Sequence, residues 1–206
     1  MMRSAFIVLE GLDGAGKSSL SRSLTDHLSA RRPALPVLHT YEPNDPSAAG
    51  EYIRAVLAKQ FAIAPRTLAL AYALNRADHS ERVITPHLTA GGIVICDRYV
   101  LSSLAYNSGP DFPMDKVMEL NAAALRPDLT LFLNASVETC YQRMGQRGGD
   151  RELFESKLED RRARYVEAIA FLRDHGQTIA LIDADGTPAQ MLAQALDVID
   201  PLLTED

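Results

Sequence analysis

Eight consecutive residues near the N-terminus have the types and spacing of a loop that binds phosphate groups. Residues 11–18 read Gly-Leu-Asp-Gly-Ala-Gly-Lys-Ser and match the pattern G-x-x-x-x-G-K-[ST] without a mismatch. Glycines let backbone N–H groups curve around phosphate oxygens, and the start of a following helix adds partial positive charge. In such a loop Lys17 reaches the β- and γ-phosphates, and the Ser18 hydroxyl binds Mg²⁺. The segment therefore predicts a nucleotide-binding site.

A second chemical feature follows the apolar run at residues 92–96, which ends at Asp97 and Arg98. Ligands of open α/β sheets bind beyond the carboxyl ends of the strands, so Asp97 is placed to hold Mg²⁺. The alternative is an aspartate that only ends the strand in a turn. Arginine binds phosphate through two parallel hydrogen bonds, so Arg98 is suited to clamp a second phosphate that belongs to an acceptor.

The reaction is not defined by the phosphate loop, because GTPase switches, ATPase motors and small-molecule kinases all use one. The guanine-reading pattern N-K-x-D is absent from the sequence. A switch or a motor has no need of an acceptor-phosphate clamp, whereas a kinase that acts on a nucleoside monophosphate does. Arg98 therefore favours the kinase.

Short apolar runs alternate with longer stretches of helical character along the chain. We expect strands at residues 5–9, 37–39, 92–96, 129–133 and 178–182. We expect helices at residues 17–30, 51–59, 65–88, 136–146, 152–175 and 188–203, with Ser136 as a helix cap. This alternation predicts an α/β fold, with a five-stranded parallel sheet flanked by helices. With no linker or repeat in the sequence, we expect a single domain over residues 1–206.

Composition excludes several classes of protein. The chain has 206 residues, 47% of them hydrophobic and 23% charged, which is typical of a folded domain. Its apolar runs are too short to cross a membrane and its N-terminus lacks the core of a secretion signal. A net charge of −6 argues against a nucleic-acid partner, and two cysteines make no disulfide framework. We expect a cytoplasmic protein with no membrane or nucleic-acid partner.

The chain resembles the thymidylate kinase (dTMP kinase) family over nearly its whole length. Besides the phosphate loop, the resemblance is carried by Glu42-Pro43 and by residues 70–79, 97–106, 126–129 and 147–151. It implies the P-loop nucleoside monophosphate kinase fold, with a lid at about residues 143–154 that closes over ATP. The implied activity is phosphorylation of dTMP to dTDP with Mg²⁺ and ATP, in a homodimer.

The resemblance also implies a role for individual positions. The implied ATP-binding residues are Gly11, Leu12, Asp13, Gly14, Ala15, Gly16, Lys17, Ser18 and Ser19. The implied dTMP-binding residues are Asp13, Glu42, Arg54, Tyr72, Arg76, Arg98, Ser102, Tyr106 and Asn107. The implied catalytic residues are Asp13, Lys17, Arg98, Arg147 and Arg151, and the implied metal ligands are Ser18, Glu42 and Asp97.

Each acceptor-side role has a simpler alternative. Asp13 matches an acid that contacts the sugar 3′-hydroxyl or orders acceptor-side magnesium, and otherwise stabilises the loop. Glu42 is otherwise a turn residue, and Arg54 a solvent-exposed residue on a helix. Tyr72 and Arg76 lie one helical turn apart, so both can face the thymine base, where the family usually has phenylalanine at the first position. The alternative for Tyr72 is packing in the core.

Gly14 stands where some family members carry an arginine in the phosphate loop. Others have glycine there and place basic residues in the lid, and Arg147 with Arg151 makes this chain similar to that kind. An arginine at the transferred phosphoryl group stabilises the charge on its oxygens. Arg143, one turn before Arg147, is assigned to a solvent-exposed helix face.

Three positions depart from the family pattern. Asn107 replaces a frequent glutamine, Tyr41 a frequent arginine, and Asn44 the usual glycine or threonine. They concern the base and acceptor-phosphate pocket and leave the ATP half untouched. The alternatives are a kinase for another deoxynucleotide or a deoxynucleoside, and a nucleotide-dependent switch without transferase activity.

Overall fold

The structure is a computed structural model that describes residues 3–31, 33, 35–44, 46–145 and 151–204. Side chains are described within these ranges except for residues 151–156. Within the described residues, no helix is both long and apolar enough to cross a membrane.

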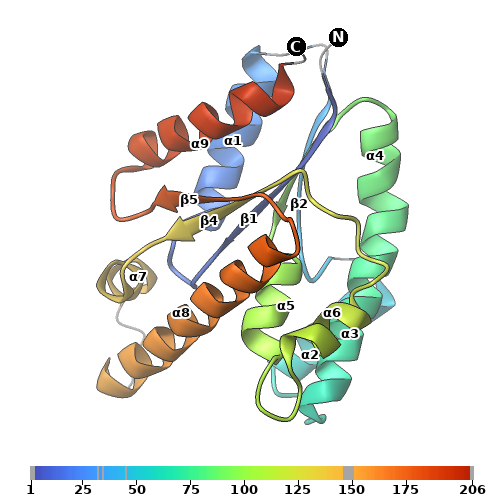
Figure 1. Ribbon diagram of the computed structural model, residues 1–206, viewed down its shortest axis with the longest axis vertical. Helices are drawn as coiled ribbons and strands as arrows, with labels where there is room; N and C mark the ends of the chain where they lie inside the picture. Colours follow the sequence, from blue (N-terminus) through green and yellow to red (C-terminus); the bar gives the residue numbers. More distant parts are fainter. Residues whose placement is uncertain (1–2, 32, 34, 45, 146–150, 205–206) are drawn as a thin grey trace.

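A five-stranded parallel sheet forms the centre of the molecule, as the sequence predicts (Figure 1). Its strands are β1 (Ala5–Gly11), β2 (Val37–Tyr41), β3 (Ile93–Asp97), β4 (Leu129–Asn134) and β5 (Ile179–Asp183). They lie in the order β2-β3-β1-β4-β5. Every residue of β1 and β3 is buried, which is why residues 5–9 and 93–96 read as unbroken apolar runs.

Helices cover both faces of this sheet (Figure 1). They are α1 (Lys17–Arg31), α2 (Ala48–Leu57), α3 (Pro65–His79), α4 (Thr85–Thr89), α5 (Val100–Asn107), α6 (Met114–Leu120), α7 (Val137–Met144), α8 (Arg151–Asp174) and α9 (Pro188–Leu203). Helices α1 and α9 pack together, with α1 against β1, β2 and β3 and α9 against β5. Helix α4 packs on β3, and α5 lies between β1 and α8.

Local capping explains where two of the predicted helices begin. The Ser136 hydroxyl accepts a hydrogen bond from the backbone N–H of Thr139 at 3.1 Å, which confirms Ser136 as the cap of α7. Thr187 and Gln190 form a capping box at the start of α9. Pro188 is the first residue of that helix, where a missing N–H has no consequence.

The helix predicted over residues 65–88 is present, but a π-helical turn interrupts its α-helical pattern. Helix α3 ends at His79, a π-helical turn spans Ser80–Ile84, and α4 follows. Pro86 has no N–H to continue the α-helical pattern, and the wider turn comes directly before it. The expected elements also omitted the two short helices α5 and α6. Helix α5 lacks a local start signal, because its cap residue Tyr99 makes no side-chain capping bond.

Candidate active site

The phosphate loop lies between the buried strand β1 and the start of α1, where the sequence places it. Lys17 is buried, and its Nζ donates hydrogen bonds to the carbonyl oxygens of Gly11 at 3.0 Å and Leu12 at 2.8 Å. Burial, followed by the nearby charge of Arg98, lowers the pKa of Lys17 to about 8. The loop therefore holds a buried lysine whose described hydrogen-bond partners are two backbone carbonyls of the same loop.

Ser18 and Asp97 meet beside this loop. The Ser18 hydroxyl donates to Oδ2 of Asp97 at 2.9 Å, and the Ser21 hydroxyl donates to Oδ1. Nε2 of His39 lies 3.7 Å from Oδ1. Burial alone would raise the pKa of Asp97, but its contacts with His39, Ser21 and Ser18 outweigh burial and lower it. The aspartate therefore stays ionised at neutral pH.

The hydroxyl oxygen of Ser18 and the carboxylate of Asp97 fit Mg²⁺. This ion prefers one or two protein oxygen ligands and completes its shell with phosphate oxygens and water. No group of three or more His, Cys, Asp or Glu side chains suited to a metal occurs in the part of the chain that the structure describes. A magnesium ion held by Ser18 and Asp97 would complete its coordination with water or with the phosphate oxygens of a nucleotide. Neither Ser21 nor His39 was predicted from the sequence.

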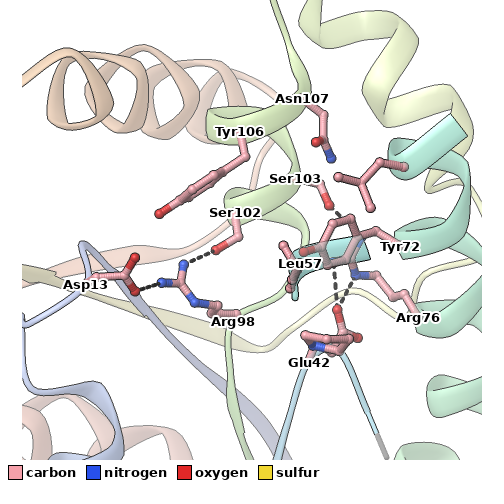
Figure 2. A pocket seen from close by; sticks show the side chains of 12 residues that line it. Asp13, Glu42, Leu57, Tyr72, Arg76, Arg98, Ser102, Ser103, Tyr106 and Asn107 are labelled. Atoms are coloured by element: carbon pink, nitrogen blue, oxygen red, sulfur yellow. Dashed lines mark hydrogen bonds and ion pairs between the residues drawn. The ribbon is translucent and has the colours of Figure 1, made fainter. Parts of the chain in front are cut away.

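Arg98 follows β3 in a left-handed backbone conformation with φ of 67°. Its Nη1 donates to the Ser102 hydroxyl at 3.1 Å, and its Nη2 donates to Asp13 (Figure 2). Nη1 of Arg98 also donates to the Tyr165 hydroxyl at 3.2 Å. Burial alone would lower its pKa, but Tyr165, Tyr106, Asp13 and Glu10 raise it. Arg98 therefore remains charged and points along the boundary between the phosphate loop and α5.

Arg76 and Glu42 form a buried ion pair on the side of the pocket opposite Arg98 (Figure 2). Nε and Nη2 of Arg76 lie 2.7 and 2.6 Å from Oε2 of Glu42, and Nδ1 of His79 lies 3.3 Å from Oε1. Nη1 of Arg76 donates to the Ser103 hydroxyl at 2.9 Å. Both carboxylate oxygens of Glu42 thus have partners within the protein, and its role as a metal ligand stays a prediction.

Two cavities meet at these residues. The first, of about 380 Å³, is lined by apolar and aromatic side chains together with polar and charged ones, and it holds most of the predicted acceptor residues. Its lining comprises Asp13, Glu42, Pro43, Leu57, Leu68, Tyr72, Arg76, Arg98, Ser102, Ser103, Tyr106 and Asn107. The second, of about 780 Å³, follows the phosphate loop and includes Gly14, Gly16, Lys17, Ser18, Ser19, Arg54 and Asp97. Asp13, Glu42, Pro43 and Arg98 line both cavities and form a shared wall.

A family model described as thymidylate kinase matches residues 9–193. The chain belongs to the thymidylate kinase family. Its fold is accordingly the P-loop nucleoside monophosphate kinase fold, as predicted. A relative from Caldivirga maquilingensis named probable thymidylate kinase is 35% identical, over 95% of this chain and 93% of the relative. Thymidylate kinases from a Synechococcus strain and from Mesomycoplasma hyopneumoniae are 36% and 32% identical, over at least 95% of both chains in each comparison.

The predicted lid of this thymidylate kinase family member is described only in part. Arg147 lies outside the described residues, and Arg151 begins α8 with a side chain that is not described. The catalytic roles of both arginines therefore stay predictions.

Arg143 is exposed on α7, as assigned, but its guanidinium also binds three backbone carbonyl groups. Its Nη1 donates to the carbonyl oxygens of Ala15 at 3.2 Å and Ala184 at 2.8 Å, and its Nη2 donates to that of Gly186 at 3.1 Å. Arg143 thus joins α7, the phosphate loop and the loop before α9. Its position one turn before Arg147 did not distinguish it from a solvated arginine, because the three carbonyl groups come from distant segments.

Arg161 and Tyr165 of α8 are further site residues without a predicted role. The Arg161 guanidinium lies 3.9 Å from the ring centre of Tyr106 and donates to the carbonyl of Ala105 at 2.7 Å. Tyr165 packs edge-on against Tyr106 with ring centres 6.1 Å apart.

Proposed function

We propose that the protein transfers the γ-phosphoryl group of ATP to dTMP in the presence of Mg²⁺, giving dTDP and ADP. The observation that carries the proposal is the wall shared by the two cavities, because a direct transfer needs donor and acceptor phosphates side by side. Membership of the thymidylate kinase family supports the same reaction. The whole chain would act as one catalytic domain, with its lid at about residues 143–154.

The donor half comprises the phosphate loop and its metal ligands. Lys17 would bind the β- and γ-phosphates once it leaves the carbonyls of Gly11 and Leu12. Ser18 and Asp97 would hold Mg²⁺, which supplies positive charge at the β- and γ-phosphate oxygens. Arg143 fixes the loop at Ala15 and so keeps its N–H groups in place.

The acceptor half combines an aromatic surface with two arginines. Tyr72 and Tyr106 line the cavity with flat rings that suit the thymine base. Arg98 lies at the shared wall, where its guanidinium would bind the acceptor phosphate through two hydrogen bonds. Arg54 donates to the carbonyl of Pro43 at 3.3 Å and lines the phosphate-loop cavity, on the side the acceptor phosphate would face.

The transfer itself requires no covalent intermediate on the protein. An oxygen of the acceptor phosphate bonds to the γ-phosphorus as the bond to the bridging oxygen of ADP breaks. The protein contributes position and fixed positive charge, from Lys17 and Arg98 and from the predicted lid arginines Arg147 and Arg151. Closure of the lid would also exclude water and so limit hydrolysis of ATP.

An exposed apolar surface on α2 and α3 supports the predicted homodimer. Tyr52, Leu70 and Leu74 are 36%, 53% and 64% exposed, and they line a shallow groove of about 550 Å³. Burying such a patch against a second copy removes apolar surface from water. Leu74→Asp should convert a dimer to a monomer in light scattering, whereas unchanged mass would reject this surface. Separately, the predicted cytoplasmic location fits an enzyme that makes dTDP as a precursor of DNA.

The decisive experiment measures ADP release from Mg²⁺ and ATP with dTMP, dUMP, dCMP, AMP or thymidine as acceptor. We expect strong stimulation by dTMP that Arg98→Ala abolishes. Stimulation by another acceptor alone would retain a kinase and direct attention to Asn107 and Tyr41. Tight ATP binding without stimulation by any acceptor would reject the transferase and favour a nucleotide-dependent switch.

A further inference from the structure

Glu10 is a fully buried carboxylate at the end of β1, directly before the phosphate loop. Its Oε1 accepts hydrogen bonds from the backbone N–H groups of Tyr99 at 2.8 Å and Ser102 at 2.9 Å. Its Oε2 accepts from the Ser102 hydroxyl at 2.6 Å and the Tyr165 hydroxyl at 3.4 Å. A buried charge needs such partners, and here they all belong to the segment after β3 or to α8.

The two backbone contacts make Glu10 the cap of helix α5. The cap residue Tyr99 and the third helical residue Ser102 are the positions whose N–H groups a capping box satisfies. Here one carboxylate from another strand accepts from both. A negative charge at this end of the helix is also electrostatically favourable.

The two hydroxyl groups that contact Glu10 lie between it and Arg98. The Ser102 and Tyr165 hydroxyls that contact Glu10 also accept hydrogen bonds from Nη1 of Arg98. The Arg98 backbone lies in the left-handed region, which is unfavourable for arginine and requires support from its surroundings. Its own N–H donates to the carbonyl of Leu9 at 2.9 Å, next to Glu10.

We propose that Glu10 is a positioning residue that fixes the Arg98 guanidinium for the acceptor phosphate, through the Ser102 and Tyr165 hydroxyls. This inference rests on the proposed function, because it takes Arg98 as the acceptor-phosphate ligand. Glu10 itself lines neither cavity, so it would act through other residues. Its carboxylate also connects the strand before the phosphate loop with the start of α5 and with α8.

The test measures by calorimetry the affinities of the Glu10→Gln variant for dTMP and for thymidine. Thymidine lacks the phosphate, so only dTMP can contact Arg98 through it. Glutamine keeps the size and one acceptor oxygen of Glu10 but removes its charge and places an amide nitrogen near the two hydroxyls. We expect affinity for dTMP to fall about tenfold, the size of a lost hydrogen bond to a charged group. Affinities for thymidine and for ATP should change less than about twofold.

Tyr165→Phe keeps the test decisive if Glu10→Gln folds poorly, and a double variant tests the coupling to Arg98. Tyr165→Phe removes one bridging hydroxyl and should lower the affinity for dTMP about threefold, again without changing the affinity for thymidine. In an Arg98→Ala background, Glu10→Gln should change dTMP affinity less than about twofold, because the two effects are coupled. Asp185→Asn is a control for loss of a carboxylate at a helix start, since the exposed Asp185 accepts from the Ser136 N–H at 2.8 Å before α7. It should leave the ratio of dTMP to thymidine affinity unchanged.

Equal losses for dTMP and thymidine in Glu10→Gln would show a general structural role and overturn the inference. A full effect of Glu10→Gln in the Arg98→Ala background would overturn it as well. Wild-type protein that binds thymidine as tightly as dTMP would reject Arg98 as the phosphate ligand, and the proposed function with it. Intact discrimination in Glu10→Gln would overturn the role of Glu10 alone.

Discussion

Nε and Nη2 of Arg76 both bind Oε2 of Glu42, at 2.7 and 2.6 Å, and each side chain is 2% exposed. This pair forms the floor of the acceptor cavity, below Tyr72 (Figure 2). Removing one partner of a buried ion pair leaves the other charge without compensation, which costs about 3–5 kcal/mol. Each side chain of the pair therefore depends on the other for charge compensation before any nucleotide binds.

We expect Glu42→Ala to lower the free energy of unfolding by about 3–5 kcal/mol in urea denaturation. Glu119→Ala is the matched control, because Glu119 lies 2.7 Å from Lys116 in a pair whose side chains are 61% and 54% exposed. Its effect should be below about 1 kcal/mol. Similar values for the two variants would contradict the account of Glu42 as a buried structural partner.

A second prediction concerns Gly14, the position at which some members of the family carry an arginine. Gly14 has φ of +83°, and a Cβ there would collide with the backbone carbonyl of Cys140 in α7. Gly91 has nearly the same φ, +82°, with nothing within 4 Å of its Cβ position. Gly14→Ala should therefore lower the free energy of unfolding by about 1–3 kcal/mol more than Gly91→Ala.

The Gly91 variant should itself lower the free energy of unfolding by about 1 kcal/mol, because alanine is disfavoured at positive φ. The difference between the two variants isolates the contact between the phosphate loop and α7. Equal destabilisation would show that the loop moves away from Cys140 without consequence. The close approach would also explain why the predicted transition-state arginines are in the lid.

The features that were predicted correctly depend on residues that are neighbours in the sequence. The phosphate loop is one short pattern between a strand and a helix, and Asp97 ends an apolar run. The five strands were found for the same reason, since a sheet buried on both faces leaves continuous apolar segments. Their ends were short by one or two residues, because polar residues such as Glu10 and Tyr41 extend them toward the site.

The features that were missed depend on residues far apart in the chain. Glu10 and Tyr165 are separated by 155 positions, and nothing near either residue indicates their contact. Helix α5 was missed because its cap is the carboxylate of Glu10 rather than a neighbouring serine or aspartate. Glu10 did give one signal, an acidic residue within a buried strand, which requires partners that only the fold supplies.

Arg143 allows a third prediction, about the donor site alone. We expect Arg143→Met to weaken ATP binding about tenfold, because hydrogen bonds from a charged donor contribute about 1.5–3 kcal/mol each. Affinity for dTMP should change less than about twofold, since Arg143 does not line the acceptor cavity. Arg82→Met is the control, because Arg82 is 71% exposed and pairs only with Asp78 in the described contacts.

Calorimetric titration of each nucleotide separates the two halves of the site. A loss of dTMP affinity as large as the loss of ATP affinity would contradict the assignment. It would show that Arg143 supports the whole domain rather than the phosphate loop.

The last prediction follows from the pKa of Lys17, which burial lowers to about 8. Phosphate binding needs the protonated ammonium group, which predominates below this pKa and is lost above it. The affinity of the free protein for Mg²⁺ and ATP should therefore fall as pH rises through about 8, by up to about tenfold per unit. ATP phosphates raise the pKa of the bound lysine, so binding above pH 8 must take up a proton.

Titration calorimetry in buffers of different ionisation enthalpy measures this proton directly. We expect uptake approaching one proton per ATP at a pH about one unit above the Lys17 pKa, where ATP itself is fully ionised. Lys17→Arg is the control, because arginine keeps its charge over this range and should show no uptake. Equal uptake by both proteins would assign the proton to another group, and the absence of uptake by wild type would mean that Lys17 is already charged.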